Sequence, residues 1–368
     1  MNILVLGGTG AIGRHLVDIL ASRNVNCTVT TRKNRENKEN VTYIKGNALN
    51  DSFLNLLLEK YWDVIVDFMV YTDLNVFSIR IKKILQRTNQ YIFISSSRVY
   101  ASSDGLLKET SSRLLDTSKD KAFLRSNEYA LMKAKEENII LESGLKNWTI
   151  VRPYLTYSSN RLQLGSLEKE AWLYRLLKGR SLVFSEDISS KYTTLTYGYD
   201  VAAGIANLIS KRSSLGEIFN ITTSEFQTWG DVLKIYLRVL EEKGKKINIV
   251  MQKETPYSFF LQTKYDRLFN RYFDNSKFIN IACDFNFTPL NTGLSRSIEE
   301  FLKDPVFNKI DWKKEATSDR ITKERTPLSE IPSIKDKFIY LIIRYLFSFR
   351  FLSTLSHKIR NMRNFMYK

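Results

Sequence analysis

The first 150 residues alternate short apolar runs with longer segments in which apolar side chains recur every three or four positions. A short apolar run between polar residues is typical of a buried strand, and the longer spacing is typical of a helix that packs on a sheet. The predicted strands are 2–6, 27–31, 41–44, 64–68, 91–94 and 148–151, and the predicted helices are 12–23, 52–60, 74–85 and 127–141. This alternation predicts an α/β fold with a doubly wound parallel sheet.

The alternation becomes less regular after Pro153. Helical spacing recurs at 168–177, 201–210 and 229–242, and short strands are predicted at 218–221 and 247–251. From about Asp304 the composition becomes charged, and further on it becomes basic and aromatic. We therefore predict a sheet domain over 1–153 to which 193–224 return, a smaller mixed part over 154–192 and 225–303, a linker over 304–333, and a basic amphipathic helical tail over 334–368.

A glycine-rich loop, Gly7-Gly8-Thr9-Gly10-Ala11-Ile12-Gly13, follows the first predicted strand and opens the first predicted helix. Glycines in this context allow a tight turn and let the backbone approach a pyrophosphate, while the helix N-terminus offers free N–H groups. The glycines fit G-x-G-x-x-G from Gly8 or G-x-x-G-x-x-G from Gly7. Either spacing predicts a dinucleotide site on a Rossmann-type sheet, and the alternative is a tight turn without a ligand.

The end of the second predicted strand bears on which cofactor is bound. An NAD-binding chain usually places Asp or Glu there, about 20 residues after the loop. This chain has Thr31, Arg32 and Lys33 instead. A cation at this point accommodates a 2′-phosphate, so the sequence favours NADP over NAD. A solvent-exposed basic loop is the alternative, because residues 32–38 are polar throughout.

Tyr129 and Lys133 lie four residues apart, on one face of a predicted helix. A nearby ammonium lowers the pKa of a phenol from about 10, which allows acid and base chemistry near neutral pH. The spacing alone is not distinctive, because Tyr174 and Lys178 repeat it. The serine run 95–97 favours Tyr129, because it ends a strand at the sheet edge where open α/β folds bind ligands.

These motifs resemble those of the short-chain dehydrogenase/reductase superfamily, in its extended NAD-dependent epimerase/dehydratase branch. The resemblance covers about residues 1–300. Besides the glycine loop it rests on residues 62–68, 94–100, 129–133 with Glu137, and 151–153, with weaker similarity at 197–202 and 216–221. It implies that the smaller mixed part binds the substrate.

The resemblance also implies roles for individual residues. Ser96 would be the catalytic serine, with Ser95 and Ser97 as open alternatives, Tyr129 the acid/base, and Lys133 the residue that holds the nicotinamide ribose. The implied NADP or NAD site consists of Gly7, Thr9, Gly10, Ala11, Ile12, Gly13, Arg32, Asn47, Ala48, Phe68, Tyr129, Lys133 and Pro153. The family mostly acts on nucleotide-activated sugars, moving a hydride between a sugar carbon and C4 of the nicotinamide.

Some positions depart from the family pattern. Asn47 stands where aspartate commonly contacts adenine. Ser97 and Arg98 stand where sugar dehydratases carry Asp-Glu, which argues against a 4,6-dehydratase and leaves an epimerase or a ketoreductase. Residues 62–71 resemble a divergent branch with chloroplast RNA-binding members. A non-catalytic nucleotide- or RNA-binding protein on the same fold is therefore the alternative.

Composition excludes several other classes of protein. The 368 residues include two cysteines and two histidines, too few for a zinc cluster, a disulfide framework or a Ser-His-Asp hydrolase to be expected. No metal site is predicted. The chain carries 56 Lys and Arg against 39 Asp and Glu, a net charge of +17.

Residues 331–368 carry +7 of this net charge, and aromatic residues are interleaved with the basic ones. This composition is typical of a helix that lies on an anionic membrane surface. A helix that packs on the body of the protein or on a second subunit is an equal alternative. Nucleic-acid binding is the weakest of the three interpretations.

The sequence also bears on the cellular location, the substrate and the oligomeric state. With no signal peptide and no apolar run of about 20 residues, a cytoplasmic protein is expected. Under the membrane interpretation of the tail, residues 334–368 contact the inner face of the membrane. We expect a nucleotide-sugar substrate. The resemblance implies a homodimer as one option, because relatives are commonly dimers, and the oligomeric state stays open. The resemblance implies a role in bacterial surface polysaccharide biosynthesis, and a lipid-linked sugar is the alternative substrate.

Overall fold

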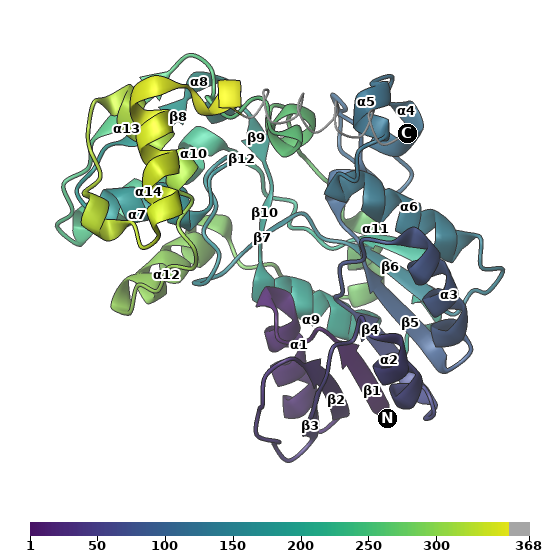
Figure 1. Ribbon diagram of the computed structural model, residues 1–368. Coiled ribbons are helices and arrows are strands. Elements are labelled where there is room, and N and C mark those ends of the chain that lie inside the picture. Colours follow the sequence, from purple (N-terminus) through teal and green to yellow (C-terminus); the bar gives the residue numbers. More distant parts are fainter. Residues whose placement is uncertain (353–368) are drawn as a thin grey trace. The chain divides into compact units, whose positions relative to one another are not determined.

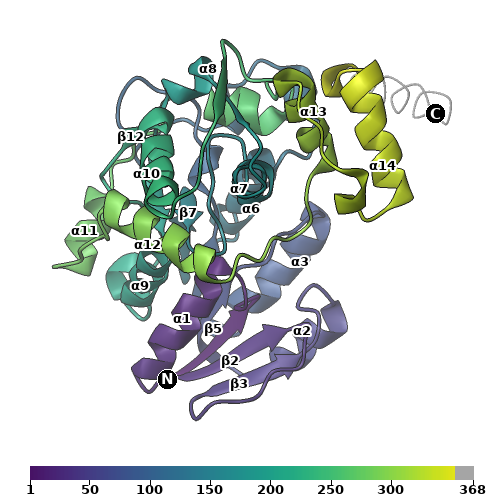
Figure 2. The ribbon, with the colours of Figure 1, turned by 90° about the vertical axis from the view of Figure 1, so that its left-hand side faces the viewer.

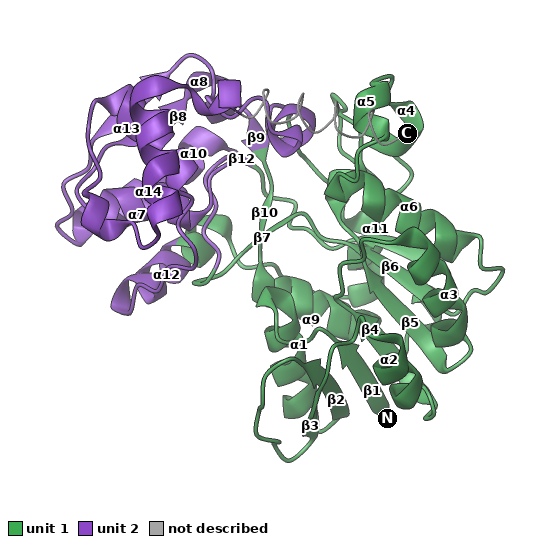
Figure 3. Ribbon diagram, in the orientation of Figure 1, with its two compact units in different colours: residues 1–160, 193–226, 270–294 green, residues 161–192, 227–269, 295–368 purple. Residues whose placement is uncertain are grey.

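The computed structural model describes residues 1–352 of the chain. They form two compact units (Figure 3). Unit 1 contains residues 1–160, 193–226 and 270–294, and unit 2 contains residues 161–192, 227–269 and the chain from 295 onward.

A seven-stranded parallel sheet lies at the centre of unit 1, in the order β11-β6-β5-β4-β1-β2-β3 (Figure 1). Its strands are β1 (Asn2–Leu6), β2 (Asn26–Thr31), β3 (Val41–Lys45), β4 (Trp62–Asp67), β5 (Thr88–Ile94), β6 (Trp148–Arg152) and β11 (Glu217–Asn220). The predicted α/β fold with a doubly wound parallel sheet is confirmed. The strand order reverses beside β1, so the carboxyl ends of β1 and β4 border the crevice where such sheets bind ligands.

Helices cover both faces of this sheet (Figures 1 and 2). Successive strand residues point to opposite faces, so Ile3 and Val5 belong to one apolar core while Leu4 and Leu6 belong to the other. The first core is closed by α1 (Ala11–Ser22), α9 (Gly198–Leu208) and α11 (Ser276–Ala282), and the second by α2 (Asp51–Leu57), α3 (Leu74–Leu85) and α6 (Tyr129–Leu141). The shorter elements of unit 1 are η1 (Ser97–Val99), α4 (Leu114–Thr117), α5 (Lys121–Leu124), η2 (Arg212–Ser214) and the parallel pair β7 (Leu155–Tyr157) and β10 (Leu195–Tyr197).

Unit 2 consists mainly of helices around the short parallel pair β8 (Leu182–Ser185) and β13 (Ile249–Gln252). Its other elements are α7 (Lys169–Leu177), α8 (Glu186–Ser189), β12 (Gln227–Thr228), α10 (Trp229–Glu242), η3 (Thr263–Arg267), α13 (Trp312–Thr322), η4 (Leu328–Glu330), α14 (Ile334–Leu341) and η5 (Ile342–Leu346). Two elements cross the boundary between the units, β9 (Tyr192–Thr193) and α12 (Leu290–Lys303). No helix of residues 1–352 is long and apolar enough to span a bilayer.

The structure differs from the predicted linker over 304–333. Residues 312–322 form helix α13, and it packs through charged side chains rather than extending into solvent. The buried Arg175 guanidinium of α7 lies 2.8 Å from Glu315, 2.8 Å from Asp319 and 2.9 Å from Glu324. The charges that predicted a solvated linker are thus partners of an arginine 140 residues away in the chain.

The structure also assigns residues 270–294 to unit 1, whereas the sequence placed them in the smaller part. The backbone N–H of Leu107 donates to Tyr272, and the N–H of Asp274 donates to Leu107. Phe278 is fully buried in the core that α9 closes. The predicted helical tail begins as α14, and residues 353–368 lie outside the described part of the chain.

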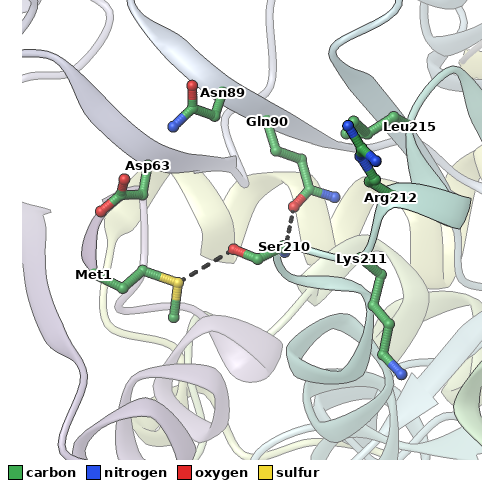
Figure 4. Close-up of a pocket in the computed structure, with 8 residues that line it drawn as sticks. All are labelled: Met1, Asp63, Asn89, Gln90, Ser210, Lys211, Arg212 and Leu215. Atoms are coloured by element: carbon green, nitrogen blue, oxygen red, sulfur yellow. Dashed lines mark hydrogen bonds between the residues drawn. The ribbon is translucent and has the colours of Figure 1, made fainter.

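Gln90 ties the amino end of the sheet to the turn between α9 and η2 (Figure 4). Its buried amide nitrogen lies 2.9–3.0 Å from Thr149 Oγ1, the Leu208 carbonyl and Ser214 Oγ. Its amide oxygen accepts from the backbone N–H of Ser210 at 2.7 Å. The pocket in the figure is lined by Gln90 and Ser210 together with Met1, Asp63, Asn89, Lys211, Arg212 and Leu215.

We expect Gln90→Leu to lower the free energy of unfolding by about 2–4 kcal/mol, because it leaves several buried polar groups without partners. Asn89→Leu is the matched control, since the neighbouring side chain on the same strand is exposed. Its effect should stay within about 0.5 kcal/mol. Urea unfolding of both variants measures the difference, and equal losses would contradict this role for Gln90.

Candidate functional site

The glycine loop between β1 and α1 forms one wall of a pocket of about 480 Å³. Gly7 has a φ of +73°, a conformation that favours glycine. A Cβ on Gly13 would lie 2.8 Å from the backbone of Gly8, so this position also requires glycine. The G-x-x-G-x-x-G spacing from Gly7 therefore matches the turn that the loop makes.

The N-terminus of α1 is open to a ligand. Gly10 is its N-cap, no side chain caps it, and its first turn carries no acidic residue. The free N–H groups and the positive end of the helix dipole both favour an anion at this point. The loop thus has the backbone that a pyrophosphate requires.

Residues at or just after the carboxyl ends of four strands, β1 to β4, line the pocket. Seven of the residues predicted to bind the cofactor line it, namely Gly7, Thr9, Gly10, Arg32, Asn47, Ala48 and Phe68. The remaining lining residues are Thr30, Thr31, Gly46, Leu49, Met69 and Val70. The other predicted cofactor residues, Ala11, Ile12, Gly13, Tyr129, Lys133 and Pro153, do not line it.

Arg80 of α3 positions the pocket loop that follows β3, and it is not among the residues predicted from the sequence. Its buried guanidinium donates to the Ala48 carbonyl at 2.8 Å and also contacts the Leu49 carbonyl and Asp51. A signal was present, because Arg80 lies on the helix face that buries Phe77 and neighbouring apolar residues. A lone arginine on an apolar helix face indicates a buried partner.

The three serines at the end of β5 have different hydrogen-bond partners. Ser95 Oγ donates to Glu137 at 2.6 Å, and Ser97 Oγ donates to the Arg152 carbonyl at 2.8 Å. Ser96 Oγ accepts from the N–H of Arg98 at 3.2 Å and, among residues 1–352, donates to no other group. Ser96 is therefore the serine whose hydroxyl proton is available to a substrate.

Tyr129 is the first residue of α6, a helix that packs against η1 and so brings the phenol to the edge where Ser96 lies. Its ring is exposed, and the Arg98 guanidinium lies 5.4 Å from its centroid. Arg98 forms an ion pair with Glu128, which also caps α6 by accepting from the N–H of Ala130. The start of α6 is thus held against the serine strand by charge.

Lys133 is buried, and its ammonium points toward the sheet. Its Nζ lies 2.9 Å from a Glu136 carboxylate oxygen, 3.4 Å from the Met69 carbonyl and 4.4 Å from the Phe93 ring centroid. Met69 itself lines the pocket. The ammonium therefore reaches the wall of the pocket and pairs with Glu136, a residue that is not among those predicted from the sequence.

A second buried carboxyl group lies at the end of β4, near this pair. Asp67 accepts from the hydroxyls of Tyr71 and Tyr91 at 2.7 and 2.8 Å, and from the N–H of Met69 at 2.8 Å. Burial raises the pKa of Asp67, although these hydrogen bonds oppose the change. Burial also raises the pKa of Glu136 to about 7, against the attraction of Lys133.

Glu137 connects the elements that carry the candidate residues. Its buried carboxylate receives two hydrogen bonds from Arg152, at 2.8 and 2.7 Å, one from Ser95 and one from Arg113 at 3.2 Å. Such a bidentate pair fixes direction as well as distance. Glu137 therefore sets α6 relative to the ends of β5 and β6.

Sequence comparison relates the chain to known proteins. A model of the NAD dependent epimerase/dehydratase family matches residues 3–222. The chain is also 24% identical over 249 residues to the chloroplast stem-loop binding protein of 41 kDa b of Arabidopsis thaliana. That match covers 63% of this chain and 61% of the relative's length.

Comparison with solved structures identifies the same fold. An epimerase of Methanothermobacter thermautotrophicus gives a TM-score of 0.63 at 17% identity, covering 82% of this chain and 92% of that one. A Bacillus anthracis dTDP-glucose 4,6-dehydratase in complex with NAD gives 0.63 at 18% identity, covering 83% and 97%. The Thermotoga maritima UDP-glucose 4-epimerase with UDP-glucose gives 0.61 at 18% identity, covering 82% and 99%.

The buried Glu136 makes stability depend on pH. Its pKa is about 7 in the folded chain against an ordinary value of 4.5, so the folded state holds this proton more tightly than the unfolded state does. Between these two values the unfolded chain loses the proton and the folded chain keeps it. The contribution of Glu136 to stability therefore falls as the pH rises through this range.

We expect the unfolding free energy of the wild type to fall by on the order of 1–3 kcal/mol relative to Glu136→Gln over this range, because the amide cannot titrate. Urea unfolding at a series of pH values measures the difference. Glu59→Gln, on an exposed turn, is the control and should follow the wild type at every pH. A constant difference between wild type and Glu136→Gln would rule out the raised pKa.

Proposed function

The chain belongs to the NAD dependent epimerase/dehydratase family, and from this premise we propose that it is an NAD(P)-dependent enzyme acting on a nucleotide-activated sugar. The observation that carries the proposal is the position of the open α1 N-terminus and its pocket at the same sheet edge as Ser96 and Tyr129. The presence of NAD or UDP-glucose in solved structures of similar fold supports this choice. A role in bacterial surface polysaccharide assembly is part of the proposal.

The residues present fit the dinucleotide. Gly7 and Gly13 leave room where a Cβ would obstruct, and the backbone from Thr9 to Gly13 offers N–H groups to the pyrophosphate. Asn47 and Ala48 would border the adenine, and Arg32 would accompany a 2′-phosphate. Phe68, Lys133 and Pro153 would lie toward the nicotinamide end. When bound, the nicotinamide supplies a carbon that accepts or gives a hydride.

The proton steps fall to this chain's own side chains. Tyr129, exposed at the start of α6, takes the proton from a sugar hydroxyl or returns it to a carbonyl. Ser96 donates a hydrogen bond to the same oxygen and holds it beside the phenol. Lys133 adds a positive charge one helical turn away. With Ser97 and Arg98 where dehydratases carry acidic residues, we propose an epimerase or a ketoreductase.

We expect Tyr129→Phe to lower kcat by about 10²- to 10⁴-fold, because the proton acceptor is lost, while the Kd for NADPH stays within about twofold. Tyr174→Phe is the control, since Tyr174 also precedes a lysine by four residues but bonds Glu330 in unit 2. Turnover of UDP-glucose, UDP-glucuronic acid and dTDP-glucose, followed by NMR of the sugar and by NADPH absorbance, provides the measurement. Full turnover by Tyr129→Phe would rule out its proposed role.

We expect NADPH to bind more tightly than NADH, and Arg32→Glu to reverse that order, because a carboxylate repels the 2′-phosphate and accepts from a ribose hydroxyl. Arg35→Glu is the control, because Arg35 is exposed in the same loop but does not line the pocket. Fluorescence titration with each cofactor measures both affinities. Equal wild-type affinities would contradict the preference for NADP.

RNA binding without catalysis is the second candidate. It is favoured by the match to a chloroplast stem-loop binding protein and by the net charge of +17. A wild-type chain that binds a stem-loop RNA at physiological salt, turns over no nucleotide sugar, and is unchanged by Tyr129→Phe would replace the enzyme proposal with this one.

A further inference from the structure

Helix α14 and η5, residues 334–346 of unit 2, pack on α13 (Figures 1 and 2). The hydroxyl of the buried Tyr340 donates to Asp319 at 2.6 Å. The Arg320 guanidinium donates to the carbonyl of Ile343, which is also buried, at 3.0 Å. These contacts determine which side of α14 and η5 is turned away from α13.

The other side of this segment is apolar, and we call it the outer face. Four large apolar side chains of residues 334–346 are exposed, namely Ile334, Phe338, Tyr345 and Leu346. Ile334 is 74% exposed, Phe338 63% and Leu346 66%. A helix packed on a protein surface normally presents polar residues to water, so this face is built to be covered.

The charges around the outer face are almost all positive. Lys335, Lys337 and Arg350 lie within residues 334–350, where Asp336 is the one acidic residue and bonds the hydroxyl of Ser333. Arg344 lies there too, and its guanidinium donates to the Glu324 carbonyl at 3.0 Å. Residues 353–368 add four basic residues and no acidic residue to the sequence. Apolar side chains combined with cations match the interface of a membrane that contains anionic lipids.

We propose that the outer face docks on an anionic lipid bilayer, with Ile334, Phe338 and Leu346 entering the interface and the basic side chains meeting lipid phosphates. A second copy of the chain fits less well, because a two-fold contact would bring this positive face against itself. Single-stranded nucleic acid also fits less well, because stacking uses aromatic rings, and two of the three most exposed residues are aliphatic. The proposal does not depend on the nucleotide site.

Co-sedimentation of the full chain with vesicles tests the apolar part of the contact. We expect binding to phosphatidylcholine vesicles that contain phosphatidylglycerol, and little binding to phosphatidylcholine alone. Phe338→Ser with Leu346→Ser should weaken binding at least about tenfold, because both side chains lose their apolar burial. Leu56→Ser with Ile79→Ser is the control, since these residues are 59% and 60% exposed on unit 1, and it should bind as the wild type does.

A second pair of variants tests the charge. Lys335→Gln with Lys337→Gln should weaken binding to the anionic vesicles about tenfold or more at low salt. Lys60→Gln with Lys119→Gln removes the same charge from exposed positions of unit 1 and should change binding little. Tyr129→Phe should bind vesicles as the wild type does, so loss of catalysis and loss of docking are separate outcomes.

Three results would overturn the proposal. The first is equal binding to both vesicle types, or none to either. The second is vesicle binding that the control pairs reduce as much as the outer-face pairs do. The third is an outer face that mediates another contact instead: sedimentation velocity that shows a dimer lost in Phe338→Ser with Leu346→Ser, or RNA binding lost in that variant, without any binding to vesicles.

Discussion

The buried ion pair between Glu137 and Arg152 is the contact on which the candidate site depends. Two carboxylate oxygens meet two guanidinium nitrogens, and the same carboxylate holds Ser95. Neither charge is exposed to water, so removing one partner would leave the other buried without compensation, which typically costs several kcal/mol. Through Ser95, the pair aligns the helix that begins with Tyr129 with the end of β5, which Ser96 follows.

Glu136, the residue that precedes Glu137 in the chain, has a different role. Glu136 forms an ion pair with Lys133. Asp67, the last residue of β4, accepts hydrogen bonds from two tyrosine hydroxyls. Burial penalises each carboxylate, and both pKa values rise. The site of unit 1 thus rests on a layer of buried polar groups in which each group constrains its neighbours.

Positive charge is divided between two roles in this chain. Arg80, Arg152 and Arg175 are buried and hold loops or helices through carbonyl and carboxylate partners. Other lysines and arginines, such as Lys335 on α14, are exposed and lie beside the apolar outer face of α14 and η5. The net charge of the sequence does not distinguish the buried arginines, which stabilise the fold, from the exposed basic residues, which are available to a partner.

Local patterns of residues determine much of the fold. The alternation of apolar runs and helical spacing predicts the strands and helices of the parallel sheet to within a few residues, because each element buries one face according to its own periodicity. The glycine loop could also be predicted from the sequence. Its tight turn, the close backbone contact between Gly8 and Gly13, and the helix N-terminus all lie within seven consecutive residues. Tertiary structure decides what depends on residues distant in the chain.

Among the three serines, only long-range partners distinguish Ser96, because Glu137 and the Arg152 carbonyl engage the other two. Two other contacts also depend on how the helices pack on the sheet. They are the ion pair between Glu136 and Lys133 and the hydrogen bond from Arg80 to the pocket loop. Residues 312–322 have the composition of a linker, but they form a helix that packs in unit 2, because Glu315 and Asp319 pair with the buried Arg175. Sequence records the period and chemistry of each segment, whereas the pairing of buried charges exists only once the segments have packed.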